Sequence, residues 1–375
     1  MKAKKILLIT TNGVNNYGAA LQAYALHNKL EEWGDVSTLN YINRHIGSSM
    51  DVLRLGSSFH GLLGTAKDLC RLWPRKRAVQ KFRTFEQKYL NLTSTMTRTD
   101  LLAGKLSIYD LYVSGSDQIW NPNCVSATGL IDGTYFLDFA PKDSRKVSVA
   151  SSIGGFVPAS SDIEEMANFL ADYEQISVRE SDTRDMFVKY LKRDVHHSLD
   201  PTLMLDVEDW SAFPDTDVLN RTTGKYLLMY SVPKLPFVLE TVNLLSKRLG
   251  LRVVALDQDP FLQIRPDVHI KDAGPEDFLT LFRNASFVVT DSFHGTCFSI
   301  NFEVPFCSTS ASVHSNRILS LLNLTRLGTR LVSTPEQVNS LDLSVDFANT
   351  RAALNKARAR DKQYLSSLTQ SGSLR

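Results

Sequence analysis

Short apolar segments alternate with helix-forming segments along most of this chain, and this alternation constrains the fold more than any other feature. The first apolar segment, KKILLIT (4–10), precedes NNYGAALQAYALHNKL (15–30), a segment whose apolar residues recur on one helical face. Two parallel strands need a crossover between them, which is usually a helix. The strand–helix–strand order therefore predicts an α/β fold with parallel sheets covered by helices.

The pattern divides into two series. In the first, the apolar segments at 107–117, 144–155 and 173–181 each end in a polar loop, and open α/β sheets bind ligands at that edge. Residues 200–224 are rich in Pro, Asp and Thr and predict a linker, after which a second series begins with KYLLMYSV. We expect an N-terminal Rossmann-like domain at 1–205 and a C-terminal one at 206–345. A C-terminal helix at 346–375 could pack back on the first domain. Two such domains facing across a cleft would be glycosyltransferase-B-like.

Composition limits the classes of partner and site. The chain of 375 residues has a net charge of +2 and is 43% hydrophobic, so it can form two cores but has no overall nucleic-acid signature. Its four cysteines form no CxxC pair and no zinc-type spacing, so we expect no metal and we expect reduced, buried cysteines, as in a cytosolic protein. No apolar run approaches the roughly 18 residues of a membrane span, which favours a soluble protein.

One segment fits neither series. Residues 66–92 read as helical apart from Pro74 and carry six Lys or Arg between positions 71 and 83. We place this segment, from about residue 60, as a basic insertion in the N-terminal domain. It is either a solvated helical face or a contact with an anionic surface, in which Trp73 and Phe82 would add interfacial burial.

The sequence TDSFHGT (290–296) carries the strongest chemical signal. Asp291 or Ser292 can cap a helix that starts directly after an apolar strand, and the first N–H groups of a helix form an anion site. A histidine at this end suits proton transfer beside a bound phosphate or carboxylate. His294 is therefore a candidate catalytic residue, with a satisfied structural histidine as the alternative.

Several other loops offer polar side chains at the ends of strands. Arg179 ends a buried strand, where an arginine is either ion-paired or faces an anionic ligand. VSGSDQIWNP combines hydrogen-bonding groups with an aromatic ring, as a sugar site does, although a polar turn explains it nearly as well. The remaining candidates for substrate contact are Asn15 and Asn16, which could instead cap a helix, Gln118, Trp120, Ser151, Ser152, Asn316 and Arg317.

Taken together, the motifs NNYGAALQAYAL, VSGSDQIWNP, ASSIGG, SVRES, LDPT, TDSFHGTCFSI and SNRI, in this order, resemble the polysaccharide pyruvyl transferase family over about residues 5–330. The resemblance implies that the functional histidine is His294 and that Arg179 binds the donor. Many relatives carry a basic residue two places before the histidine, where this chain has Ser292. Arg317 or another cation would then have to replace that donor contact.

The resemblance also implies a reaction. Phosphoenolpyruvate would give its carbon skeleton to two hydroxyls of a sugar, forming a cyclic ketal, with no cofactor and no metal. His294 would transfer protons, and Asp117 would contact the acceptor hydroxyls. The acceptor could be a sugar linked to polyprenyl pyrophosphate, which would place the enzyme in the cytoplasm, at times peripheral to the inner membrane, in capsule or exopolysaccharide synthesis. Two alternatives remain: a nucleotide-sugar glycosyltransferase, in which Asp257 or Asp259 could contact a ribose, and an inactive carbohydrate-binding protein.

Overall fold

The computed structural model describes residues 3–54, 65, 68–232, 234, 236–309 and 315–370, except for the side chains of residues 315, 316, 369 and 370. The chain divides into two units. Unit 1 contains residues 1–49, 86–205 and 356–375, and unit 2 contains residues 50–85 and 206–355. The chain passes from unit 1 to unit 2 after Ser49 and after Leu205, and it returns to unit 1 after Phe85 and after Asn355.

Unit 1 is built on a parallel sheet with the strand order β2-β1-β3-β4. Isolated bridges, Val147 with Gln175 and Ser151 with Val178, lead from this sheet to the parallel pair β5-β6. The strands are β1 (Lys5–Ile9), β2 (Asp35–Thr38), β3 (Leu111–Ser114), β4 (Lys146–Ser148), β5 (Ser177–Val178) and β6 (His196–His197). Because β1 pairs with β2 on one side and β3 on the other, the strand order reverses between β1 and β3. Such a switch point is the usual ligand edge of this fold.

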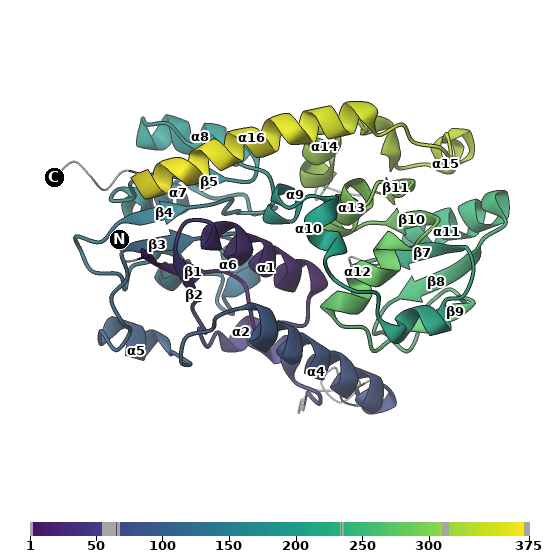
Figure 1. The fold of residues 1–375 in the computed structure, drawn as a ribbon, viewed down its shortest axis with the longest axis horizontal. Helices are drawn as coiled ribbons and strands as arrows, with labels where there is room; N and C mark the ends of the chain where they lie inside the picture. The colour runs from purple at the N-terminus through teal and green to yellow at the C-terminus, as the bar shows by residue number, and fades with distance from the viewer. Residues whose placement is uncertain are drawn as a thin grey trace. The chain divides into compact units, whose positions relative to one another are not determined.

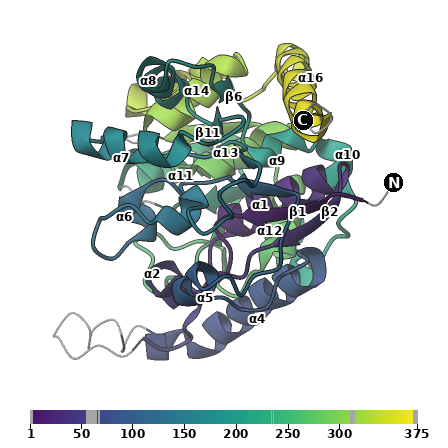
Figure 2. The same ribbon diagram turned by 90° about the vertical axis from the view of Figure 1, so that its left-hand side faces the viewer.

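The helices of unit 1 follow from local capping and periodicity. Helix α1 (Tyr17–Glu31) connects β1 to β2 and lies beside both strands (Figure 2). The other helices and 3-10 turns of this part are α2 (Arg44–Gly47), η1 (Ser48–Met50), α5 (Arg98–Leu102), α6 (Pro122–Val125), η2 (Gly133–Phe136), α7 (Ser160–Leu170), α8 (Ser181–Leu191) and α9 (Pro201–Met204). The C-terminal helix α16 (Ala348–Gln370) contributes its residues from Lys356 onward to unit 1.

Unit 2 contains a six-stranded parallel sheet with the order β12-β11-β10-β7-β8-β9. Its strands are β7 (Tyr226–Tyr230), β8 (Arg252–Leu256), β9 (Val268–Ile270), β10 (Phe287–Thr290), β11 (Phe306–Thr309) and β12 (Leu331–Val332). Figure 1 shows these strands with the helices of the same unit around them. Strands β7 and β10 pair side by side, Leu227 opposite Phe287 and Tyr230 opposite Thr290. The switch point of unit 2 therefore lies between the carboxyl ends of β7 and β10.

The helices and 3-10 turns described in unit 2 come from both of its chain segments. They are α4 (Leu72–Tyr89), whose last residues belong to unit 1, α10 (Val207–Ser211), η3 (Asp217–Arg221), α11 (Pro236–Leu249), α12 (Pro275–Arg283), α13 (Phe293–Asn301), α14 (Ser315–Leu324), η4 (Gly328–Arg330) and α15 (Pro335–Ser340). An apolar cluster that includes Leu227, Val242 and Val289 fills the space between sheet and helices. The predicted α/β class with parallel sheets is confirmed.

Three local expectations need correction. The segment 200–224 is not a plain linker: Asp200 and Asp206 cap the short helices α9 and α10, and Trp210 is fully buried. The basic segment, predicted as an insertion of the first domain from about residue 60 to 92, is divided between the units: its part up to Phe85 belongs to unit 2, and residues 86–92 belong to unit 1. Residues 60–64, 66 and 67 of this segment lie outside the described residues. Of the cysteines, Cys70 is exposed, although Cys297 and Cys307 are buried as expected.

Candidate active site

The turn between β10 and α13 positions His294. Ser292 has an extended backbone, and its side chain accepts a hydrogen bond from the N–H of Gly295 at 3.3 Å, so it is the N-cap of α13. His294 is the second residue of the helix. Its side chain is half-buried, and its Nε2 atom is covered by protein. The imidazole thus lies at the positive end of a helix and at the ligand edge of the sheet.

Gly295 allows α13 to begin close to the sheet. A Cβ atom at this position would lie 2.3 Å from Oγ1 of Thr290 and 3.0 Å from the ring of Tyr230. Both contacts are closer than van der Waals packing permits, and neither partner is the mobile end of a long side chain. The glycine after the histidine therefore sets how near His294 comes to the ends of β7 and β10.

Asp291 joins the two strands at the switch point. Its carboxylate accepts hydrogen bonds from the Ser231 hydroxyl at 2.6 Å and from the N–H of Val232 at 2.8 Å. The residue is 5% exposed. From the sequence, either Asp291 or Ser292 could cap the helix. In the structure Ser292 is the cap, and Asp291 links the loops after β7 and β10.

Lys234 is a cation at this edge that the sequence analysis missed. Its backbone N–H donates to the Ser231 hydroxyl at 3.1 Å, which links it through Ser231 to Asp291. Its Nζ atom lies 3.0 Å from Asp257 and 3.2 Å from Asp259. Lys234 has a positive φ of 58°, which is uncommon for a residue other than glycine, and this backbone conformation sets the direction of its side chain. A single lysine in SVPKLP carries no sequence signal that distinguishes it from an ordinary loop residue.

Arg317 approaches the same helix start from α14. Its guanidinium carbon lies 5.7 Å from the centre of the Phe293 ring, and the rings of Phe293 and His294 are 5.4 Å apart. Two predicted site residues, His294 and Arg317, thus both lie next to Phe293. Asn316 belongs to the first turn of α14, but its side chain lies outside the described part of the structure.

Arg179 lies at the carboxyl end of β5 in unit 1, inside a cluster of carboxylates. Its guanidinium contacts Asp200 at 2.7 Å, Glu180 at 3.1 Å and Asp117 at 3.7 Å, and the side chain is 3% exposed. Burial alone would lower the pKa of Arg179, but the charges of Glu180, Asp200 and Asp117 outweigh it and raise the pKa. These contacts correspond to the ion-paired alternative, and donor binding by Arg179 stays a prediction.

Ser151 and Ser152 are internal hydrogen-bonding groups of unit 1. The Ser151 hydroxyl donates to the carbonyl of Ser114 at 2.9 Å, and the Ser152 hydroxyl donates to Glu180 at 2.6 Å. Ser152 also accepts from Arg179 at 3.1 Å. Both serines are fully buried. We correct the expectation that they offer free hydroxyls to a substrate: they support the loop that carries Arg179.

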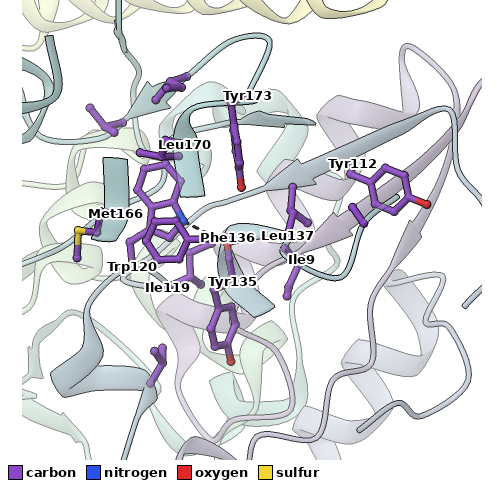
Figure 3. Close-up of a cluster of buried hydrophobic side chains, with 14 of the residues drawn as sticks. Ile9, Tyr112, Ile119, Trp120, Tyr135, Phe136, Leu137, Met166, Leu170 and Tyr173 are labelled. Atoms are coloured by element: carbon purple, nitrogen blue, oxygen red, sulfur yellow. Dashed lines mark hydrogen bonds between the residues drawn. The ribbon is translucent and has the colours of Figure 1, made fainter. Parts of the chain in front are cut away.

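Trp120 is a core residue and not a stacking platform. It is 1% exposed and stacks on Phe136 with ring centres 5.0 Å apart (Figure 3). Its Nε1–H donates to the Ser114 hydroxyl at 3.1 Å. The expectation that its ring faces a sugar is wrong, because this face of the loop turns into the hydrophobic core.

The polar residues before Trp120 lie nearer the surface. Asp117 has a positive φ of 70°, and its side chain is 14% exposed beside Arg179. Gln118 is partly buried and accepts a hydrogen bond from Asn121 at 3.0 Å. Asp117 and Gln118 follow β3, one of the two strands at the switch point of unit 1, so a role in acceptor binding stays a prediction for both.

The asparagines before α1 have structural partners. The exposed Asn16 is the N-cap of α1 and accepts a hydrogen bond from the N–H of Ala19 at 3.3 Å. The backbone N–H of Asn15 donates to the Ser49 hydroxyl at 3.0 Å. The capped-helix alternative thus holds for Asn16, while Asn15 lies partly buried at the carboxyl edge of β1.

Two classes of feature are missing from the described part of the chain. It contains no group of three or more His, Cys, Asp or Glu side chains placed to hold a metal ion. Nor does any described helix combine the length and apolar character needed to cross a membrane.

Comparisons with known proteins agree with this geometry. A family model described as polysaccharide pyruvyl transferase matches residues 16–312. Among solved structures, S. aureus MnaA with UDP gives a TM-score of 0.51 at 12% identity, covering 98% of this chain and 90% of that one. A putative UDP-N-acetylglucosamine 2-epimerase from Listeria monocytogenes gives 0.52 at 9% identity, covering 99% and 91%. A comparison with curated proteins finds no match. At these identities the structures support the fold alone, and the predicted pair of Rossmann-like domains of glycosyltransferase-B type is confirmed.

Proposed function

The chain belongs to the polysaccharide pyruvyl transferase family, and from this premise we propose that it transfers pyruvate from phosphoenolpyruvate to two hydroxyls of a sugar. The product would be a cyclic ketal, with release of phosphate. The family match over residues 16–312 carries this proposal. The geometry around α13 supports it, because the imidazole of His294 lies at a helix N-terminus and the guanidinium of Arg317 lies against the neighbouring Phe293 ring.

The proposed reaction has two bond-forming steps. A proton adds to the methylene carbon of phosphoenolpyruvate, and the first sugar hydroxyl attacks the neighbouring carbon. The bond from that carbon to the phosphate oxygen breaks and leaves an oxocarbenium-like centre. The second hydroxyl then closes the ring. Of the two hydroxyl protons, one balances the proton taken up by carbon and the other leaves with phosphate.

His294 is the proposed proton-transfer residue. An imidazole can take and give protons near neutral pH, and one placed at a bound phosphate can serve either the methylene carbon or the leaving group. The N-terminal N–H groups of α13 would stabilise the negative charge on phosphate in the same place. Ser292, which caps this helix, orients both groups.

Two cations would bind the donor, which carries at most three negative charges. Arg317 lies against Phe293, next to His294. Lys234 is tied through Ser231 to Asp291, the residue before the cap. Asp257 and Asp259 pair with the lysine, and a bound phosphate or carboxylate would replace one of these carboxylates. We propose that Lys234 and Arg317 together replace the basic residue that many relatives carry at the position of Ser292.

The residues proposed to bind the acceptor sugar belong to unit 1. Asp117 and Gln118 follow β3 at the switch point and offer oxygen and nitrogen atoms of the kind that bind sugar hydroxyls. We further propose an acceptor linked to polyprenyl pyrophosphate, with the protein acting in the cytoplasm at the membrane face.

One observation weakens the glycosyltransferase alternative. That reaction would need an acidic side chain for a nucleotide ribose, and Asp257 and Asp259 were the candidates. Both carboxylates pair with Lys234. A lysine bridging them favours an anionic donor group at this edge over two ribose hydroxyls.

Single-turnover kinetics test the proposal. Purified protein is mixed with phosphoenolpyruvate and candidate lipid-linked sugars, phosphate release is timed, and the sugars are analysed by mass spectrometry for the ketal. We expect phosphate release that depends on acceptor and matches the ketal formed. Transfer from a nucleotide sugar with no use of phosphoenolpyruvate would replace our proposal by the glycosyltransferase alternative. Sugar binding without either reaction would indicate an inactive binding protein.

A further inference from the structure

Helix α4 has a buried face and an exposed face. The basic residues that follow one another closely in the sequence are divided between these two faces. The buried face repeats at helical spacing through Arg75, Ala78, Val79, Phe82 and Phe85. The sequence from Leu69 to Phe85 contains no Asp or Glu. The opposite face is therefore free of acidic side chains along this whole stretch.

The buried basic residues of this region have internal roles. Arg71 and Arg54 both bind the carboxylate of Asp68, at 2.7 Å and 2.9 Å. Arg75 is 4% exposed and donates to the carbonyl of Asp51 at 2.7 Å. Burial, with the nearby charges of Arg71 and Arg54, lowers the pKa of Arg75 to about 10. Neither Arg71 nor Arg75 can contact an outside surface, and Phe82 is fully buried as well.

The outward side carries apolar and basic groups together. Trp73 is 70% exposed and Leu69 is 57% exposed. Lys76 lies over the Trp73 ring at 5.7 Å from its centre, and Arg83 is exposed on the same side. Arg77 is also exposed there: its side chain is 72% exposed, although one guanidinium nitrogen lies 3.6 Å from Asp272. We call these five residues, four from α4 and Leu69 from the segment just before it, the outer face of α4. Lys81 is not included, because its Nζ atom pairs with Asp277 at 2.6 Å.

We propose that the outer face of α4 docks unit 2 onto an anionic lipid surface. The charges of Lys76, Arg77 and Arg83 complement acidic headgroups, and such groups contribute to membrane binding when they lie near the surface. An exposed tryptophan beside a leucine and flanked by cations matches the composition of interfacial membrane contacts, in which the apolar groups enter the headgroup boundary.

Lipid fits this face better than nucleic acid does. Cations and an aromatic ring would suit either partner. The aliphatic side chain of Leu69, however, offers nothing to a phosphodiester or a base edge, while a bilayer would bury it. The chain as a whole is nearly neutral at +2, which is unlike a nucleic-acid-binding domain.

Vesicle binding tests the proposal without any reaction. The full chain is sedimented with vesicles of phosphatidylcholine and with vesicles that also contain phosphatidylglycerol. We expect binding only to the anionic vesicles, weakened by salt. The variant Lys76→Gln/Arg77→Gln/Arg83→Gln should bind about a hundredfold more weakly, since each charge near the surface accounts for about fivefold.

A matched variant controls for total charge. Lys225, Lys247 and Arg265 are exposed bases elsewhere in unit 2, so Lys225→Gln/Lys247→Gln/Arg265→Gln removes the same charge. This control should bind anionic vesicles like the unaltered protein. Trp73→Ala should also bind more weakly, with an unchanged melting temperature because the ring is exposed.

Tryptophan fluorescence gives a second readout. Of the chain's four tryptophans, Trp120 and Trp210 are buried and Trp73 is the most exposed. Emission should therefore shift to the blue with anionic vesicles, and Trp73→Phe should abolish most of the shift.

Three results would overturn the inference: no binding to anionic vesicles, equal loss in the two triple variants, or stronger binding to single-stranded nucleic acid that depends on Trp73. Because these assays contain neither donor nor sugar, their outcome is independent of whether the proposed transfer reaction is correct.

Discussion

At the scale of single residues, the start of α13 concentrates the chemistry of unit 2. Ser292 caps the helix, His294 lies one residue inside it, and Asp291 braces the neighbouring loop through Ser231. The position two places before the histidine thus serves as a cap in this chain, and a serine does this better than a long cation. The cations proposed to bind the donor come instead from other places: Lys234 from the loop after β7, and Arg317 from α14.

His294→Ala should abolish transfer and leave the fold intact. Loss of a general acid–base group costs about a hundredfold or more in kcat, and the half-buried ring is not part of the core. Transfer is measured by ketal formation, and folding by thermal melting. His45→Ala, at an exposed histidine of α2, is the control and should keep full activity. A folded His294→Ala protein with more than about a tenth of normal activity would contradict the proposed role.

Lys234→Met should chiefly raise KM for phosphoenolpyruvate. A hydrogen bond to a charged group contributes about 1.5–3 kcal/mol, so KM should rise by roughly tenfold to a hundredfold. Adding Ser292→Lys to this variant should restore part of the affinity by placing a cation at the position used by relatives. An unchanged KM would leave Lys234 as a partner of Asp257 and Asp259 only.

Arg179→Met should chiefly lower the stability of the fold and should have a smaller effect on donor binding. The substitution leaves Asp117, Glu180 and Asp200 near one another without their cation, and breaking a buried ion pair costs about 3–5 kcal/mol. The melting temperature should fall by roughly 10 °C. If it does not change while KM for phosphoenolpyruvate rises, Arg179 binds the donor as the family resemblance implies.

At the scale of elements, the distance between α13 and the sheet is set by one missing side chain. Strands β7 and β10 end side by side, and α13 starts immediately above them because Gly295 has no Cβ. Any larger residue would move the helix start, and with it His294, the cap and the N–H groups of the first turn.

Gly295→Ala should therefore lower activity more than the addition of a single methyl group would suggest. Overpacking at Thr290 and Tyr230 costs about 1–3 kcal/mol, and the helix start moves away from the donor. Gly47→Ala in α2 is the matched control, because a Cβ there meets nothing within 4 Å. Both variants are compared by melting temperature and by kcat. Equal behaviour of the two would show that close approach of α13 is not required.

At the scale of the whole molecule, each unit is assembled from separate pieces of chain. Unit 1 needs residues 356–375 in addition to its two N-terminal pieces. In this last piece, Asp361 accepts hydrogen bonds from the N–H of Leu199 and from His196, both at 2.8 Å, and the Tyr364 hydroxyl donates to the carbonyl of Ser148 at 2.8 Å. The C-terminal helix is therefore part of the core of unit 1.

Truncation after Asn355 should destabilise unit 1 and spare unit 2. It removes the buried side chains of Tyr364, Leu365 and Leu368 and leaves the N–H of Leu199 without its acceptor. Hydrogen exchange should increase in β4, β5 and β6 while β7, β8 and β10 stay protected. Truncation after Gln370 serves as the control. Uniform loss of protection in both units, or none in either, would contradict this assignment.

The sequence by itself determined the features that depend on near neighbours. Strand and helix positions follow from the spacing of apolar residues, and the start of α13 follows from an apolar strand, a cap at Asp291 or Ser292, and a glycine at 295. For the same reason His294 could be placed at a helix N-terminus, and the order of motifs identified the family.

Only the tertiary structure decided features that join distant residues. Arg179 meets Asp200, which lies 21 positions away, and so became part of an ion cluster. Lys234 meets Asp257 and Asp259, and residues 50–85 pack with unit 2 although they follow the first strands of unit 1. Trp120 turns into the core because of the loop after β3, where Asp117 has an unusual backbone conformation. Side-chain direction and charge pairing at long range depend on which elements pack together, and local spacing carries no information about that.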